Sequence, residues 1–110
     1  MKQGEIWYAA LDPTEGSEQA GFRPVVILSG NLANEYAPVV VCCPLTTQLN
    51  HYFGNPILKP DSTNGLKKPS EVMLIHIRSI AKSRLKKRIG KVSSLELKQC
   101  KQTLTDLMNF

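Results

Sequence analysis

The spacing of the hydrophobic residues changes once along this chain, and that change restricts the folds that it can adopt. Up to residue 92 the apolar residues come in short runs separated by segments rich in Gly, Pro and Asn, which is typical of strands joined by loops. From Ser93 onward they recur at helical spacing, and Ser93 and Glu96 form the pattern of a capping box. We therefore predict a mainly β, α+β fold: a small, partly open barrel followed by one amphipathic helix.

Six segments carry the signals of strands. They are residues 5–11, 23–29, 39–45, 56–59, 70–80 and 89–92. We expect residues 70–80 to be a central strand, because apolar side chains fall on both of its faces. Pro44 predicts a bulge or a strand end in the third segment. We expect loops at residues 12–21, 30–38 and 50–55, a turn at residues 61–65 and a helical turn at Arg84–Leu85.

Length and composition restrict the class of protein. With 110 residues the chain is large enough for one core, and we expect a single domain spanning residues 1–110. No apolar run approaches the roughly 20 residues that cross a bilayer. Residues 1–3 lead directly into a strand-like segment, so we expect no signal peptide and a cytoplasmic location.

The cysteines and histidines give no sign of a disulfide framework, a metal centre or a bound cofactor. Cys42 and Cys43 are adjacent in an apolar segment, where side chains point to opposite faces of a strand, and Cys100 lies on the helical pattern. His51 and His76 are the two histidines, and no CxxC or HxxxH spacing occurs. We expect buried, reduced thiols and no metal or cofactor.

One arginine, Arg23, stands between a polar, glycine-flanked loop (Gly16–Gly21) and an apolar strand. Pro24 fixes the start of that strand and biases Arg23 toward an extended backbone. A cation held at the edge of a buried sheet suits an anionic ligand better than it suits stability. This placement points to a phosphate.

Half of the 14 Lys and Arg residues fall between positions 78 and 91, with no acidic residue among them. This basic block consists of Arg78, Lys82, Arg84, Lys86, Lys87, Arg88 and Lys91. Such a block can simply be a solvated face, and a net charge of +5 alone would favour that alternative. Together with Arg23, the block favours a nucleic acid as the ligand.

Polar residues also follow the third predicted strand, where Thr46, Thr47 and Gln48 end its apolar run. Hydroxyl groups at a strand end often only form turns. If this strand end meets the one that carries Arg23, a guanidinium and two hydroxyls lie at one rim. The neighbouring loop would add Ser17, Glu18 and Gln19 to that rim. The candidate platforms for stacking on bases are Trp7, Phe22, Tyr36, Tyr52 and Phe53, although a core position is the commoner one for a large aromatic on an interior strand such as Trp7.

Short motifs in order along nearly the whole chain resemble the MazF/PemK family of toxin ribonucleases, the mRNA interferases of bacterial type II toxin–antitoxin systems. They are Gly4-Glu5-Ile6-Trp7, Leu11-Asp12-Pro13-Thr14, Gly16-Ser17-Glu18-Gln19 with Arg23-Pro24-Val25, Pro44-Leu45-Thr46, Ser70-Glu71-Val72, Ile77-Arg78-Ser79-Ile80 and Lys82-Ser83-Arg84-Leu85. Each motif alone is weak, whereas the ordered set is specific.

The resemblance implies an SH3-like barrel of the PemK/CcdB type, assembled as a homodimer. It implies a toxin that inhibits translation and growth by metal-independent, sequence-selective cleavage of single-stranded RNA. Attack by a 2′-hydroxyl would leave a 2′,3′-cyclic phosphate and a 5′-hydroxyl. The catalytic arginine and threonine of the family fall on Arg23 and Thr46.

The partners implied are single-stranded RNA and an acidic antitoxin, and neither a membrane nor double-stranded DNA is expected as a partner of the toxin alone. The residues that we expect to bind RNA are Ser17, Glu18, Gln19, Thr47, Gln48, Arg78, Lys82, Arg84, Lys86 and Lys87.

The chain departs from one plasmid-borne branch of the family. That branch uses a histidine, an arginine and an aspartate, and the matching positions here are Ser17, Met73 and Ile75. The acid–base set of that branch is therefore absent. His76 is a candidate proton carrier in compensation, although a core or interface position is the commoner one for a histidine.

Two other functions stay open at the level of sequence. A toxin family that poisons DNA gyrase shares this fold, but its chains end in a tryptophan-glycine-aliphatic signature, whereas this one ends Leu107-Met108-Asn109-Phe110. In such a protein Arg23 and Thr46 would have no reason to occur together. A degenerate toxin that binds RNA or an antitoxin without cleavage is the other alternative.

Overall fold

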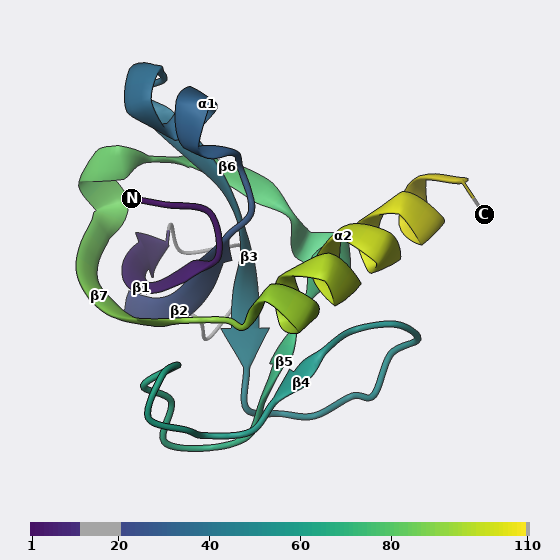
Figure 1. The fold of residues 1–110 in the computed structure, drawn as a ribbon. Coiled ribbons are helices and arrows are strands. Elements are labelled where there is room, and N and C mark those ends of the chain that lie inside the picture. Colours follow the sequence, from purple (N-terminus) through teal and green to yellow (C-terminus); the bar gives the residue numbers. More distant parts are fainter. Residues whose placement is uncertain (12–20, 110) are drawn as a thin grey trace.

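The computed structural model describes residues 1–11 and 21–109, and in these residues a strongly curved sheet is joined by two α-helices and two 3-10 turns. The strands are β1 (Glu5–Leu11), β2 (Gly21–Ile27), β3 (Val39–Thr46), β4 (Ile57–Leu58), β5 (Ser70–Val72), β6 (Arg78–Ala81) and β7 (Leu85–Lys91). The helices are α1 (Asn31–Tyr36) and α2 (Ser94–Asn109), and the 3-10 turns are η1 (Leu74–His76) and η2 (Lys82–Arg84). Figure 1 shows a partly open barrel with α2 running along one side, as predicted.

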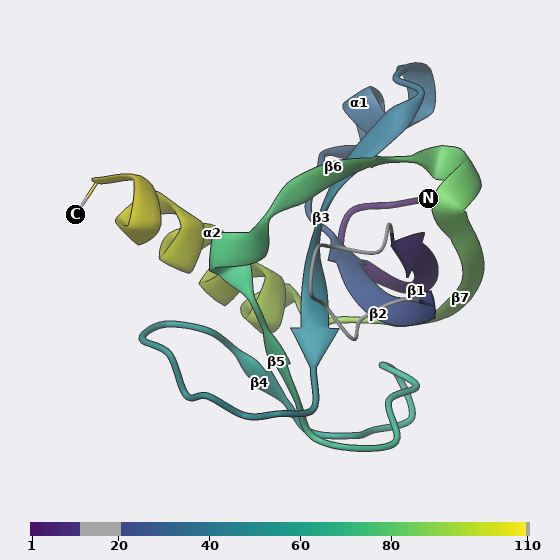
Figure 2. The ribbon, with the colours of Figure 1, turned by 180° about the vertical axis from the view of Figure 1, so that it is seen from behind.

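The central strand is β3. One of its edges pairs antiparallel with β2, and its other edge pairs with β6 along its first half and with β5 at its end. Beyond β2 the sheet continues through β1 to β7. The chain from β6 to β7 arches around β1 and β2, and this arch gives the barrel its curvature (Figure 2).

Alternation along β2 and β3 sends their side chains into two separate apolar cores. Val26 and Cys43 pack in one core with Cys100 of α2, whereas Val25 and Cys42 pack in the other, which the curved sheet encloses. The adjacent cysteines therefore point to opposite faces of β3, as their sequence predicts. All three thiols are buried.

The predicted capping box begins α2. The backbone N–H of Ser93 donates to Glu96 Oε1 at 2.8 Å, and the backbone N–H of Glu96 donates to Ser93 Oγ at 3.1 Å. Within the described ranges, neither helix combines the length and the apolar character that a membrane crossing requires.

Residues 30–38, predicted as a loop, contain the short helix α1 instead. The polar residues that suggested a loop anchor this helix. Asn34 is buried, and its side-chain amide donates to the Ser29 carbonyl at 2.8 Å. Ser29 also accepts a hydrogen bond from the Val41 backbone, so it ties the segment to β3.

Residues 70–80, predicted as one central strand, are divided into β5, η1 and β6. The two strands pair with different stretches of β3, and the 3-10 turn between them places Leu74 in the core beneath α2. The apolar residues on both faces therefore reflect a turn packed against a helix. Pro44 does not end β3, because its missing N–H lies where β3 passes from one partner to the next, and its carbonyl accepts from the Met73 N–H at 3.0 Å.

The last strand begins at Leu85 and not at Ile89 as predicted, so it includes the charged run from Lys86 to Arg88. Charged residues suit this position because, among the described strands, β7 pairs only with β1 and lies at the end of the sheet. The turn at residues 61–65 lies against Ile89, Gly90 and Lys91. A Cβ added to Gly90 would lie 2.3 Å from the Asn64 carbonyl, so only glycine permits this approach.

Candidate functional site

A pocket of about 300 Å³ lies where β2 begins and β3 ends. Its lining residues are Phe22, Arg23, Pro24, Leu45, Thr46, Thr47 and Gln48. The structure thus brings together the two strand ends that the sequence singled out, and Arg23 and Thr46 line the same pocket.

Strand pairing explains why these two residues meet. Val25 and Pro44 are the last pair in the antiparallel register of β2 and β3, and continuing that register by two steps leads to Arg23 and Thr46. Directly opposite residues share a face of the sheet. The pairing of β2 with β3 ends at Val25 and Pro44, whereas Leu45 and Thr46 pair with β5 on the other edge of β3. The pocket lies beyond the last pair of β2 and β3.

The hydroxyl of Thr46 is oriented by the chain that follows it. Its Oγ1 accepts a hydrogen bond from the Gln48 backbone N–H at 3.1 Å, which bends the chain sharply after β3. Thr47 and Gln48 are exposed on this bend. The turn-forming role expected of a hydroxyl at a strand end is therefore real, but it does not exclude a contact to a ligand, because a hydroxyl oxygen has a second lone pair and a proton to donate.

A buried carboxylate, Glu71, holds the segment that follows this bend. Its oxygens accept hydrogen bonds from the backbone N–H groups of Asn50, His51 and Tyr52 and from the Asn55 side chain, at 2.7, 2.7, 3.2 and 2.9 Å. Burial alone would raise the pKa of Glu71, but these hydrogen bonds outweigh burial and hold the pKa below its ordinary value. Glu71 pairs with Thr46 across β3 and β5, so it supports the pocket from behind.

Sequence reasoning did not assign this role to Glu71. The available signal was a single acidic residue between Ser70 and Val72 in a segment that is otherwise apolar. A lone charge in a predicted central strand requires several hydrogen bonds, and a neighbouring loop can supply them.

The basic block is spread over β6, η2 and β7, and among the described residues none of its members lines the pocket. Arg84 is linked to the pocket through β1, because its guanidinium donates to the Ala10 carbonyl at 3.1 Å, and Ala10 pairs with Phe22. Arg78 pairs with Cys42 on β6, and Arg88 forms an ion pair with Glu5 at 3.0 Å. Lys82 is half-buried, and Lys86 and Lys87 are exposed.

Three predicted RNA-binding residues, Ser17, Glu18 and Gln19, lie outside the described residues. His76 is exposed on η1 and does not line the pocket, so a core position is excluded. Its role as a proton carrier stays a prediction. Of the five aromatic candidates, all of them described, Phe22 is the one that lines the pocket.

Neither thiol nor metal chemistry is evident in the described part of the chain. Burial raises the pKa of Cys42 to about 11 and that of Cys100 to about 12, and it raises the pKa of Cys43 as well. These thiols therefore stay protonated at neutral pH and are poor nucleophiles. Residues 1–11 and 21–109 contain no group of three or more His, Cys, Asp and Glu side chains arranged to hold a metal ion.

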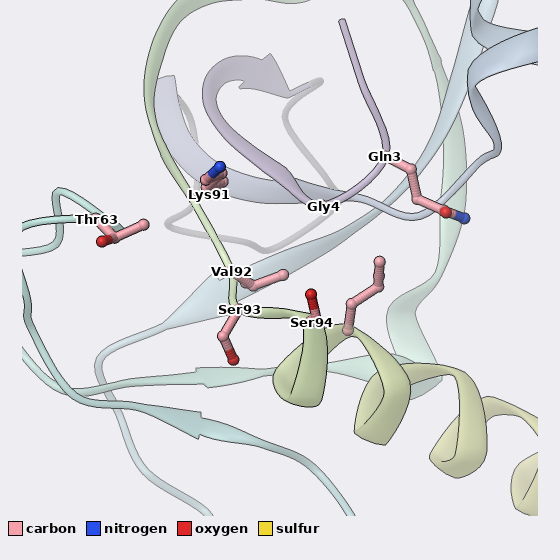
Figure 3. A pocket seen from close by; sticks show the side chains of 8 residues that line it. Gln3, Gly4, Thr63, Lys91, Val92, Ser93 and Ser94 are labelled. Carbon is pink, nitrogen blue, oxygen red and sulfur yellow. The ribbon is translucent and has the colours of Figure 1, made fainter.

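A second pocket, of about 360 Å³, lies beside the start of α2 (Figure 3). It is lined by Gln3, Gly4, Thr63, Lys91, Val92, Ser93, Ser94 and Leu97. Apart from Lys91 of the basic block, it contains none of the residues for which the sequence predicts a role in binding or cleaving RNA. The capping box already occupies the backbone N–H groups of Ser93 and Glu96, so the first pocket is the stronger candidate site.

Comparison with known proteins agrees with this fold. Residues 2–108 match the family described as PemK-like, MazF-like toxin of type II toxin-antitoxin system. The chain is 37% identical over 109 residues to endoribonuclease MazF9 of Mycobacterium tuberculosis, covering 94% of this chain and 92% of that protein. It is 34% identical over 100 residues to endoribonuclease MazF of Staphylococcus saprophyticus, covering 90% and 83%.

Among solved structures, MazE-MazF from Deinococcus radiodurans matches with a TM-score of 0.82 at 24% identity, covering 100% of this chain and 96% of that chain. The Mycobacterium tuberculosis toxin MazF-mt6 matches with a TM-score of 0.80 at 22% identity, covering 96% and 97%. These structures confirm the predicted fold class. The match over residues 2–108 and the two relatives above 30% identity show that the chain belongs to the family of PemK-like, MazF-like toxins of type II toxin–antitoxin systems.

Proposed function

We propose that this protein is the toxin of a toxin–antitoxin module and acts as an endoribonuclease that cleaves single-stranded RNA, including mRNA, at selected sequences. The observation that carries the proposal is the pocket where β2 begins and β3 ends, which is lined by both Arg23 and Thr46. Two relatives that cover most of the chain are named endoribonucleases, which supports the same reaction.

The proposed reaction uses the nucleophile that RNA carries. The 2′-oxygen attacks the adjacent phosphorus, and the bond from phosphorus to the 5′-oxygen breaks. One proton leaves the 2′-hydroxyl and one is taken up by the departing oxygen, so the products are a 2′,3′-cyclic phosphate and a 5′-hydroxyl. Such a reaction depends on positioning the 2′-oxygen in line with the phosphorus and on stabilising negative charge.

Arg23 and Thr46 fit two parts of this task. The pKa of an arginine exceeds about 12, so Arg23 stays charged and its fork of N–H donors stabilises the phosphate oxygens as their charge grows. Thr46 lines the same pocket as Arg23, so its hydroxyl can donate to the phosphate or hold the 2′-hydroxyl. No metal ion is required for either role.

The remaining contacts to RNA are assigned to polar and basic residues around the pocket. Thr47 and Gln48 line it directly, and the loop with Ser17, Glu18 and Gln19 precedes β2 in the chain. Residues further along the RNA path are Arg78, Lys82, Arg84, Lys86 and Lys87, which would follow the phosphodiester backbone. Because mRNA is found in the cytoplasm, the proposed substrate implies that the toxin acts there.

We also propose a two-fold symmetric homodimer and an acidic antitoxin as partners. One pocket of this size holds little more than one nucleotide, whereas two copies side by side would make a longer groove. An acidic antitoxin segment would compete with phosphate for the same cations.

The proposal is tested by incubating the purified protein with a long single-stranded RNA in the presence of EDTA. We expect cleavage at a small set of sequences, with 2′,3′-cyclic phosphate and 5′-hydroxyl ends. A substrate with one 2′-deoxy sugar at the mapped cut site should resist, because it lacks the nucleophile. Strict dependence on added magnesium, or cleavage of the deoxy substrate, would contradict this mechanism.

A further inference from the structure

Phe22 is a large aromatic side chain that the fold itself does not use. It is 66% exposed, although it lies within β2, and it belongs to neither apolar core. An isolated exposed hydrophobic residue needs no explanation in general. This one differs because it lines the candidate pocket immediately beside Arg23.

The residues that line the pocket come from both faces of β2. Neighbouring residues of a strand point to opposite faces, so Phe22 and Pro24 share the face that Arg23 does not occupy. Leu45 also lines the pocket, but it is buried and packs in the core that contains Cys43 and Cys100. Phe22 is therefore the exposed apolar residue of the pocket, and Arg23 and Thr46 supply polar groups.

The ring of Phe22 has a small neighbour on β1. Its cross-strand partner there is Ala10, whose methyl group is too short to cover an aromatic ring. The large exposed fraction of Phe22 is consistent with this pairing. A flat ligand can therefore approach the ring from the side of the pocket.

We infer that Phe22 stacks on the base of a nucleotide next to the bond that Arg23 and Thr46 act on. This inference rests on the proposed function. A nucleotide combines an anionic phosphate with a flat, largely apolar base, and the pocket is lined by a cation, Arg23, and by an exposed aromatic ring, Phe22, on the adjacent residue. Single-stranded RNA presents unpaired bases, and aromatic side chains are the common platform for them.

In this arrangement Phe22 contributes to substrate binding but does not determine which RNA sequences are cleaved. Every base has a π-face, so stacking on a phenyl ring tolerates all four bases. Base selection would come from groups that form hydrogen bonds. Replacing Phe22 therefore weakens binding and leaves the set of cleaved sequences unchanged.

The test uses a short RNA that contains a cut site mapped with the unchanged protein. Phe22→Ala should raise KM by roughly 5- to 150-fold, the range that the loss of one base–aromatic stack corresponds to, with a smaller effect on kcat. Phe22→Trp keeps an aromatic face and should keep KM close to that of the unchanged protein. Phe22→Leu keeps an apolar side chain without an aromatic face and should resemble Phe22→Ala.

Leu32→Ala is the matched control. Leu32 is a large apolar residue that is also strongly exposed, at 73%, but it lies on α1, which precedes β3, whereas the pocket lies at the far end of that strand (Figure 1). An eight-residue strand at about 3.3 Å per residue separates α1 from the pocket. Leu32→Ala should leave KM and kcat unchanged.

Abasic substrates identify the stacked base. Each nucleotide that flanks the cut is replaced in turn by an abasic one. At one position, removal of the base should raise the KM of the unchanged protein by about the same factor as Phe22→Ala does. It should not raise the KM of the Phe22→Ala variant any further. This loss of additivity is the signature of a direct contact.

The outcomes separate this inference from the proposed function. If the unchanged protein cleaves RNA while Phe22→Ala keeps its KM, or if no abasic position shows the loss of additivity, the stacking role is wrong and the nuclease stands. If the unchanged protein does not cleave RNA, both fail. If light scattering shows that Phe22→Ala changes the oligomeric state and explains the higher KM, the partner of the ring is protein and the inference is overturned.

Discussion

Arg23 supplies the charge that the proposed reaction needs, and its replacement should separate chemistry from folding. Arg23→Ala removes one preorganised donor to the transition state, so we expect the single-turnover rate to fall by about 10²- to 10³-fold. Arg23→Lys keeps the charge without the fork of donors and should recover only part of the rate. Thermal melting of each variant, measured alongside, should change little. Normal cleavage by Arg23→Ala would place the site elsewhere, and His76 would become the next candidate.

Thr46 supplies a hydroxyl to the same pocket, and replacing Thr46 tests what that hydroxyl does. Thr46→Ala should lower the single-turnover rate by a similar or somewhat smaller factor, because one hydroxyl is lost at the reacting phosphate. Thr46→Ser is the matched control, since it keeps a hydroxyl that can also accept from the Gln48 N–H. Equal rates for Thr46→Ala and Thr46→Ser would show that the hydroxyl only forms the turn.

At the scale of elements, the hydrogen bonds of Glu71 make the segment after β3 sensitive to acid. The pKa of Glu71 in the folded protein lies below its ordinary value of 4.5, so its contribution to stability is complete above about that pH and is lost as the pH falls through the folded pKa. Glu71→Gln should lower the free energy of unfolding at neutral pH by about 1–3 kcal/mol. It should also make the fall of that free energy toward low pH, the acid limb, less steep. Urea unfolding from pH 7 down to pH 3 measures both effects.

Two other carboxylates matter for that experiment, one as a control and one as a second source of acid sensitivity. Glu35→Gln, an exposed position on α1, should leave the acid limb unchanged. Burial would raise the pKa of Glu5, but its hydrogen bonds to the Lys2 N–H and the Trp7 indole, with the charges of the N-terminus and Arg88, lower it. Part of the acid limb therefore remains in Glu71→Gln. An acid limb as steep as that of the unchanged protein would contradict the role given to Glu71.

The contact between the 61–65 turn and β7 gives a second prediction for an element. An added methyl group at Gly90 would meet the backbone of Asn64 and Thr63, so Gly90→Ala should destabilise the fold by about 1–3 kcal/mol or more. Gly30→Ala is the control, because nothing lies within 4 Å of its added Cβ. Thermal melting compares the two variants. Equal melting temperatures would mean that the turn moves away without cost.

The elements whose local signals agreed with their packing could be predicted from the sequence. The capping box of α2 and the opposite faces of Cys42 and Cys43 are examples, because both depend on neighbours in the chain. The break at η1 could not be predicted, since it follows from β3 changing partners from β6 to β5. The charged start of β7 was missed because an edge strand needs few apolar residues.

The same contrast applies to the candidate site. The meeting of Arg23 with Thr46 could be predicted because each lies at the end of a recognisable apolar strand. The support that Glu71 gives to the pocket depends on the loop at residues 50–55 folding over it. The place of Phe22 in the pocket depends on how β2 lies beside β3. Neither is a property of a local sequence window.

At the scale of the whole molecule, the proposed dimer and its antitoxin can be examined together. We expect light scattering at micromolar concentration to report twice the mass of one chain. An acidic antitoxin that competes with phosphate for the cations of the pocket should inhibit less strongly as salt rises, because salt screens exposed charges over about 10 Å at 0.1 M. A monomer with full ribonuclease activity would contradict the shared groove, and inhibition that does not depend on salt would contradict the electrostatic competition.

The three buried thiols can report which part of the protein opens to solvent. Cys42 faces the core within the curved sheet, whereas Cys43 and Cys100 face the core beneath α2. A thiol reagent can modify them only when the surrounding core is exposed to solvent, and their raised pKa values slow any reaction in the folded state. Mass spectrometry of a brief labelling pulse would therefore distinguish a helix that lifts from the sheet, which exposes Cys43 and Cys100, from a barrel that unrolls and exposes Cys42.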